Sequence, residues 1–372
     1  MSRKLELDGT KINWYHERVR AWERGERIAP ITIDMALTTD CNMRCQFCYG
    51  QLQKNTKKII KKKHMTRFLQ DASDIGVKGV SLVSDGESSI SPAFVHTIKY
   101  GKQCGLAMAT GTNAYLVKGK MLEDILPHLS YLRVNISAGE ESRYNEIMGA
   151  QPGMFKQVCE NIEAMVKMKR TGDSNCTIGM QMVFMPKYVD QVLPLSKLAI
   201  NLGVDYLVIK HCSDDEEGRL GVDYGGYAST SKTLKAAEAL STERTRIVVK
   251  WSKISECDSS GSNRSYSRCY GPPFILQLSG TGLVAPCGML FNERYKGYHM
   301  GNITETSFKE IWESNRYWEI IRHLASGEFD AKTQCGSFCL QHSVNKYLDA
   351  YKEGIIELVE PEGKSPEHIE FI

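Results

Sequence analysis

Short apolar runs alternate with longer amphipathic stretches between about residues 31 and 211. Six of these runs are rich in β-branched residues and nearly continuously apolar, which is typical of parallel strands covered on both faces. A glycine typical of a helix C-cap precedes three of them, at Gly76, Gly105 and Gly203. The pattern predicts an α/β fold with a parallel sheet built from six strands, at about 31–38, 78–84, 106–111, 131–137, 177–184 and 205–211.

The pattern changes beyond residue 211. A polar stretch covers 211–227, and a helix candidate at 231–240 and a strand candidate at 246–251 follow it. Two apolar runs, 274–278 and 283–285, flank a Ser-Gly-Thr-Gly turn and predict a β-hairpin. Helical spacing covers 307–324 and resumes near Leu340, and the acidic stretch 357–372 is expected to be a surface tail.

The composition narrows the class of protein. The chain has 372 residues, of which 42% are hydrophobic, and this excludes disordered and fibrous classes. A formal charge of +3 is too small for a protein that coats nucleic acid, so no nucleic-acid partner is expected. The charged N-terminal region does not resemble a signal peptide, and no apolar run approaches the ~18 residues of a membrane span. We therefore expect a cytoplasmic protein without membrane contact.

Twelve cysteines are many for a chain of this class. A disulfide framework is disfavoured in a reducing compartment, so clustered cysteines point to metal or redox chemistry. Cys41, Cys45 and Cys48 form a C-x3-C-x2-C motif directly after the first predicted strand. Three thiolates can hold three irons of a 4Fe-4S cluster and leave the fourth iron open, whereas a zinc site needs a fourth protein ligand.

This motif resembles that of the radical S-adenosylmethionine (SAM) superfamily, which has the same spacing and an aromatic residue, here Phe47, before the third cysteine. The resemblance implies a six-stranded partial (β/α)6 barrel over about 31–211. It also implies SAM as cofactor and a reductant such as flavodoxin or ferredoxin as partner. In that chemistry an electron from the cluster cleaves SAM, and the resulting radical abstracts hydrogen from the substrate.

The resemblance also implies where SAM binds. A Gly-Gly-Glu motif follows the second strand in the family, and here Asp85-Gly86-Glu87 stands at that place, followed by Ser88 where proline is usual. Gly86 and Glu87 match the motif, whereas Asp85 and Ser88 depart from it. The other implied contacts, most of which follow predicted strands, are Phe47, Asn113, Asn135, Ser137, Arg143 and Gln181.

A second set of cysteines lies near the C-terminus: Cys269, Cys287, Cys335 and Cys339. Their arrangement resembles the shortened "twitch" form of the SPASM extension, which implies one auxiliary 4Fe-4S cluster and so two clusters per chain. A four-thiolate zinc site is the alternative, and His342 is expected to be a surface residue. The chain is thereby divided into an extension (1–30), the radical SAM core (31–211), a connecting segment (212–268), a SPASM/twitch-like domain (269–345) and a helix end with tail (346–372).

The substrate is less well defined by the sequence. About thirty residues precede the core, fewer than a leader-peptide-binding domain needs, so we expect a small polar substrate: a sugar, an aminocyclitol or a nucleotide-like molecule. The outcome would be epimerisation, with Cys212 returning a hydrogen atom, or dehydrogenation, with His211 or Lys210 as base. Two alternatives are a peptide-modifying maturase and a non-catalytic iron-sulfur carrier or zinc scaffold. The lysine-rich run 54–63 is expected to be a solvated face, with an anionic partner as the sharper hypothesis.

Overall fold

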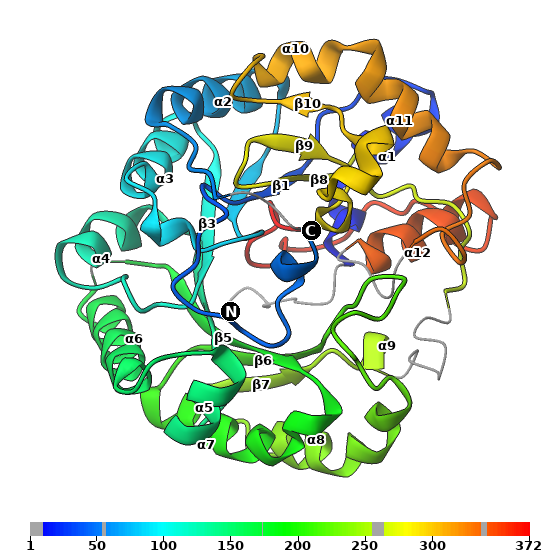
Figure 1. The fold of residues 1–372 in the computed structure, drawn as a ribbon. Helices are drawn as coiled ribbons and strands as arrows, with labels where there is room; N and C mark the ends of the chain where they lie inside the picture. The colour runs from blue at the N-terminus through cyan, green and yellow to red at the C-terminus, as the bar shows by residue number, and fades with distance from the viewer. Residues whose placement is uncertain (1–9, 54–56, 173, 255–263, 336–340) are drawn as a thin grey trace.

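The computed structural model describes residues 10–53, 57–172, 174–254, 264–335 and 341–372. Ten strands of these ranges form one sheet, in the order β10-β9-β8-β1-β2-β3-β4-β5-β6-β7, and the sheet curls into a partial barrel (Figure 1). The six predicted strands are confirmed, and each pairs in parallel with its neighbour in sequence. They are β1 (Thr32–Met35), β2 (Gly79–Leu82), β3 (Ala107–Thr112), β4 (Tyr131–Asn135), β5 (Thr177–Phe184) and β6 (Tyr206–His211).

Two further strands lengthen the parallel part of the sheet. The strand β7 (Arg246–Val249) pairs with β6, and β8 (Ile275–Leu278) pairs with β1 on the other side. The predicted hairpin is present, because β8 also pairs antiparallel with β9 (Leu283–Ala285), which is followed in the sheet by β10 (Gly301–Asn302). The C-terminal cysteine region therefore shares its first strand with the barrel wall.

Helices cover the outside of the barrel in a ring (Figure 1). Strand residues that face them, such as Leu132 and Val134 of β4, are fully buried. Gly76 and Gly203 end α2 and α7 in left-handed conformations with φ of 99° and 70°, as predicted. The ring consists of α2 (Lys62–Ile75), α3 (Phe94–Gln103), α4 (Gly119–Ile125), α5 (Glu141–Met148), α6 (Met154–Arg170), α7 (Val192–Leu202) and α8 (Ser231–Glu238).

Two helices replace the single stretch predicted over 307–324. The first, α10 (Phe308–Glu313), stops at Ser314, and α11 (Asn315–Ala325) begins there because Ser314 Oγ accepts the Tyr317 amide at 3.2 Å. The helix expected near Leu340 is α12 (His342–Lys352). It packs with the N-terminal helices η1 (Thr10–Tyr15) and α1 (His16–Glu23) in a small second core. His342 is buried and lies 3.0 Å from the Tyr266 hydroxyl, so its prediction as a surface residue is wrong.

The expectation of a surface tail is wrong for the last residues of the chain. Thr32 Oγ1, at the start of β1, donates to the Glu370 carbonyl at 2.8 Å. The ring of Phe371 lies edge-on to Tyr131, at the start of β4, with centroids 5.0 Å apart. Residues 368–372 therefore lie across the amino ends of the barrel strands, and the C-terminus sits inside the ring of helices in Figure 1. The glutamates of 357–372 indicated a solvated tail, although apolar side chains near its end fix it to the barrel.

Helices in the described part of the chain are all too short or too polar to cross a membrane.

Candidate active site

The cysteine triad lies on the loop that leaves the carboxyl end of β1. Two neighbouring segments hold this loop in place. On one side the Ile60 amide donates to the Leu37 carbonyl at 2.9 Å, just upstream of the triad. On the other side the Arg44 amide, within the triad, donates to the Met148 carbonyl at the end of α5 at 3.1 Å. The loop is thus fixed at both ends over the mouth of the barrel.

The three thiols lie near one another on this loop. Cys41 is exposed, and Cys45 and Cys48 are half-buried. Protein surrounds the Cys41 sulfur although the residue keeps accessible surface, and this desolvation raises the pKa of Cys41 to about 12. Burial also raises the pKa values of Cys45 and Cys48, and the proximity of the other thiols adds to the rise at Cys45. Buried thiolates are stable only beside a positive charge, and bound iron would supply it. The donor set therefore fits a cluster bound through three cysteines. No three metal-ligating side chains within the described ranges meet at a single ion position.

The Asp85-Gly86-Glu87 segment packs directly beneath the cysteine loop. Gly86 has a φ of 89°, and a Cβ there would lie 2.1 Å from the Thr38 carbonyl oxygen, so the position requires glycine. The Glu87 amide donates to the Asp40 carbonyl at 2.7 Å, next to the first cysteine. This segment and the cysteine loop are therefore positioned as one unit.

The buried Glu87 carboxylate joins the ends of two strands. It accepts hydrogen bonds from Ser89 Oγ at 2.6 Å, from Thr112 Oγ1 at 2.8 Å and from the Asn113 amide at 2.7 Å. The Asn113 side chain in turn donates to Asn42 Oδ1 at 2.7 Å, inside the cysteine motif. Glu87 and Asn113, both predicted as SAM contacts, are thereby brought together beside the loop.

Asp85, the residue that departs from the family motif, binds the C-terminal hairpin. Its carboxylate accepts Ser279 Oγ at 2.7 Å and the Gly280 amide at 2.8 Å, in the turn between β8 and β9. A glycine at position 85 could not make these bonds. The departure therefore connects the loop after β2 to the second cysteine region.

Three other predicted contacts lie at or just after the end of β4 and in the middle of β5. Asn135 and Gln181 are register partners in the two strands, and Gln181 Nε2 donates to Asn135 Oδ1 at 2.8 Å. Ser137 is fully buried, and its Oγ accepts the Val183 amide at 3.1 Å. The structure thus brings these polar groups together at the barrel mouth.

Arg143 lies further out, on α5. Its guanidinium pairs with Asp190 through two bonds of 2.8 and 3.0 Å and also with Glu146. A SAM carboxylate would have to compete with these two protein carboxylates. The role of Arg143 as a SAM contact therefore stays a prediction.

The end of β6 carries the three predicted catalytic residues. Strand alternation places Lys210 and His211 on opposite faces, and Lys210 is the one whose charge acts on Asp34 of β1. Cys212 is buried, and its Sγ lies 3.7 Å from the carbonyl oxygen of Phe47, which is itself nearly buried in the cysteine loop. Burial raises the Cys212 pKa to about 12, so the thiol stays protonated at neutral pH.

Two interior residues were missed by the sequence analysis, Asp34 of β1 and Arg133 of β4. Asp34 keeps some accessible surface but is surrounded by protein. Burial raises its pKa to about 6, and the charges of Arg133 and Lys210 and a hydrogen bond with Gln277 oppose that rise. Charged residues inside otherwise apolar strands were the available signal, since an interior face seldom carries a charge without a partner.

Three of the four C-terminal cysteines line one cavity of about 40 Å³: Cys269, Cys287 and Cys335. Gln341 lines it as well and fixes its wall by donating to the Pro286 carbonyl at 2.8 Å. Glu216, from the polar connecting stretch, also reaches this cavity. The fourth cysteine, Cys339, lies outside the described residues. Three thiols from distant parts of the chain around one cavity fit a bound cluster.

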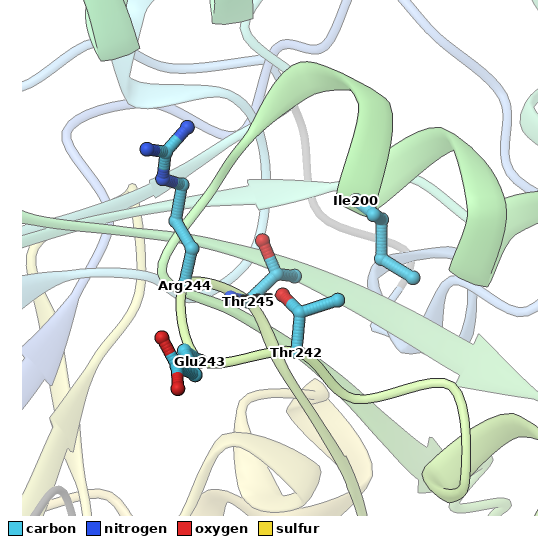
Figure 2. Close-up of a pocket in the computed structure, with 5 residues that line it drawn as sticks. All are labelled: Ile200, Thr242, Glu243, Arg244 and Thr245. Atoms are coloured by element: carbon cyan, nitrogen blue, oxygen red, sulfur yellow. Dashed lines mark hydrogen bonds between the residues drawn. The ribbon is translucent and has the colours of Figure 1, made fainter.

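A hollow elsewhere on the surface has none of this chemistry. It measures about 450 Å³ and is lined by Ile200 and by residues 242–245 of the loop that enters β7 (Figure 2). It lies at the amino ends of the strands, opposite the cysteine loop, and none of the predicted site residues lines it.

Comparison with family models agrees with this geometry. The Radical SAM superfamily model matches residues 35–194, and the SPASM iron-sulfur cluster-binding domain matches 269–339. The chain is a radical SAM enzyme with a SPASM domain. The radical SAM domain binds SAM and a 4Fe-4S cluster, and the SPASM domain binds auxiliary iron-sulfur clusters.

Relatives of this radical SAM enzyme extend over most of its length. It is 24% identical to the AdoMet-dependent heme synthase of Methanosarcina barkeri, with 83% of this chain and 88% of the relative aligned. It is 20% identical to a tungsten-containing aldehyde ferredoxin oxidoreductase cofactor-modifying protein of Pyrococcus furiosus, over 76% and 81% of the two chains. Among solved structures, SuiB of Streptococcus suis bound to SAM has a TM-score of 0.62 at 16% identity, over 82% of this chain and 71% of SuiB. These likenesses confirm the fold.

Proposed function

We propose that this radical SAM enzyme abstracts a hydrogen atom from a small polar molecule bound inside the barrel, below the cysteine loop, and that the product is an epimer or an oxidised form of it. The cluster held by Cys41, Cys45 and Cys48 would supply the electron that cleaves SAM. The single observation that carries the proposal is the placement of polar groups on the interior face directly beneath that loop. These groups are Asp34, Arg133, Asn135, Gln181 and Lys210.

Closure of the far end of the barrel supports a small substrate. Residues 368–372 lie across the amino ends of the strands, so a substrate would enter from the cysteine-loop end and stop inside. Relatives that align over most of both chains are named for heme synthesis and for cofactor modification. A peptide substrate is the second candidate, because a structure of the fold neighbour SuiB is described as bound to its precursor peptide.

Two residues at the end of β6 are the candidates for the step that follows hydrogen abstraction, one for each of the two outcomes. Cys212 has a protonated, buried thiol next to the cysteine loop and could donate a hydrogen atom to a substrate radical. Lys210, on the interior face, could act as base if the reaction is a dehydrogenation, with the auxiliary cluster accepting the electron. The alternation of β6 favours Lys210 over His211 in that role.

One auxiliary iron-sulfur cluster would be bound in addition to SAM and the SAM-binding cluster. Cys269, Cys287, Cys335 and Cys339 would hold it, and Glu216 would connect its cavity to the polar stretch that follows Cys212.

Iron and SAM cleavage test this proposal together. The anaerobically loaded chain should contain about eight irons and release 5'-deoxyadenosine and methionine from SAM under reduction. Replacing Cys41, Cys45 and Cys48 by alanine should lower the iron to about four and abolish the release. Cys104→Ala, which removes a thiol on the outer side of the barrel, is the matched control and should keep both. Stoichiometric zinc without acid-labile sulfide would overturn the proposal.

The role of Cys212 has its own test. During turnover in heavy water, Cys212→Ala should fail to deliver deuterium to the reacting carbon, although the abstracted hydrogen still appears in 5'-deoxyadenosine. Cys159→Ala on α6 is the control and should deliver it as the parent does. Equal delivery by Cys212→Ala would exclude Cys212 as donor.

A further inference from the structure

Arg133 occupies an unusual position in the middle of the barrel. Along β4, the exposure alternates: Tyr131, Arg133 and Asn135 keep accessible surface, whereas Leu132 and Val134 have none. Successive side chains of a strand point to opposite faces, and the buried pair faces the helices. Arg133 therefore faces the interior of the barrel, one layer below Asn135.

Glycines flank Arg133 on both neighbouring strands. Its register partners are Gly111 on β3 and Gly179 on β5. A Cβ at Gly111 would lie 3.8 Å from Arg133 Nη2, so the guanidinium extends along the face of β3. The space above Gly179 is taken by the ring of Tyr206, which a Cβ there would meet at 2.1 Å. The Val83 side chain also lies over Gly111, 2.9 Å from the same Cβ, so Val83 bounds the guanidinium on the β3 side and Tyr206 bounds it on the β5 side.

Part of the hydrogen-bonding capacity of Arg133 is not used by the described residues. Its Nε is buried and has no acceptor, and within the described ranges no carboxylate lies within 4 Å of its nitrogens. Its aromatic contact is with Tyr131, at 5.8 Å from the ring centroid. Arginine carries five N–H donors in a planar fork, and buried donors are nearly always paired in native proteins. An acceptor that enters with a ligand would satisfy them.

A second cation faces the same region from across the barrel. Asp34 on β1 is influenced by both Arg133 on β4 and Lys210 on β6, and these strands are not neighbours in the sheet. They can act on the same carboxyl because all three meet across the interior. Asp34 itself hydrogen-bonds Gln277 of the adjacent β8.

We propose that Arg133 binds a carboxylate group of the substrate inside the barrel. The planar fork of arginine matches the two oxygens of a carboxylate. The inference rests on the proposed function, because it names the class of molecule that enters the barrel. Arg133 lies about 7 Å below Asn135 at the strand end, as a rise of about 3.4 Å per residue requires. The carboxylate would thus enter first and leave the rest of the molecule facing the cysteine loop.

Fluorine NMR of small aromatic probes tests this site without knowledge of the substrate. The anaerobically loaded full chain is titrated with 4-fluorobenzoate, with the neutral 4-fluorobenzamide and with 4-fluorophenyl phosphate. We expect the benzoate to bind at least ten-fold more tightly than the amide. Arg133→Gln should weaken benzoate binding about ten-fold, Arg133→Lys should weaken it less, and the exposed-site control Arg322→Gln should not change it.

Each other outcome overturns a defined part of the inference. Benzoate binding that Arg133→Gln and Arg133→Lys leave unchanged would exclude the site, and if the glutamine variant does not fold, the lysine variant decides. Tighter binding of the phosphate, with the same dependence on Arg133, would replace the carboxylate by a phosphate. SAM cleavage by the parent is measured separately: a parent that binds benzoate through Arg133 but never cleaves SAM would contradict the proposed function and leave the anion site in place.

Discussion

At the carboxyl ends of its strands the barrel carries polar loops joined by side chain to backbone hydrogen bonds, whereas at the amino ends the chain's own C-terminus lies across it. At the first end, Glu87 alone joins the loops after β2 and β3 through Thr112 and Asn113. At the second end, Phe371 packs on Tyr131, and Thr32 holds the tail backbone. Polar groups at one end are arranged for a ligand, and contacts at the other end are arranged for closure.

This difference bears on the site proposed inside the barrel. A barrel open at both ends would let water reach the interior charges from two directions, and water weakens the interactions between those charges. A closed amino end would keep water from reaching the charges of Asp34, Arg133 and Lys210 from that side. The comparison leads to three predictions, each of which weakens one end.

The largest effect is expected from Phe371→Ala at the closed end. Phe371 is 8% exposed, and its removal takes away the ring packed on Tyr131. Phenylalanine to alanine substitutions at buried sites cost about 3 kcal/mol or more, so the free energy of unfolding in urea should fall by about 3 kcal/mol. Ile355→Ala, at a position 74% exposed, is the control and should change it by less than about 0.5 kcal/mol. Equal losses from the two variants would mean that the tail does not close the barrel.

A smaller effect is expected from Asp85→Ala at the open end. The substitution leaves Ser279 Oγ and the Gly280 amide without their acceptor in a buried turn. An unpaired buried donor costs about 1–3 kcal/mol, so we expect a loss of about 2 kcal/mol in the same urea titration. Asp85→Asn keeps one acceptor oxygen and should lose less. An unchanged free energy of unfolding in Asp85→Ala would show that the hairpin is held without this carboxylate.

The smallest effect depends on pH and concerns His368 in the tail. Burial lowers its pKa to about 4, and the charges of Lys11 and Lys169 act in the same direction, while its Nε2 lies 2.8 Å from Thr177 Oγ1. The neutral form is therefore favoured in the folded chain. Its stabilising contribution is full above pH 6.5 and is lost as the pH falls toward 4.

His368→Gln should remove this part of the acid sensitivity, worth about 1 kcal/mol between pH 7 and pH 5.5. Unfolding free energies at the two pH values measure it. His323→Gln on α11 is the control and should follow the parent. An unchanged acid sensitivity in His368→Gln would assign the effect to other groups.

The local pattern of the sequence was sufficient for much of the fold. The six strands of the barrel, the glycine caps at Gly76 and Gly203 and the β8–β9 hairpin follow from nearest-neighbour chemistry, and all are confirmed. The Cys41, Cys45 and Cys48 motif also lies within eight residues, so its spacing alone indicates its chemistry. The break at Ser314 was missed because helical periodicity continues across it, although the serine caps the second helix.

Tertiary structure decided what depends on residues far apart in sequence. Asp85 acquires its role from a turn about two hundred residues later, and Phe371 acquires its role from Tyr131. The charges of Arg133 and Lys210 both act on Asp34 because a curled sheet brings non-adjacent strands to face each other across an interior. The sequence by itself determined the strands, the caps and the cysteine motif, since these depend on neighbours along the chain. The tertiary structure decided which charges face one another inside the barrel and which end is closed. Burial and electrostatic interaction depend on distances in space and not on distances along the chain.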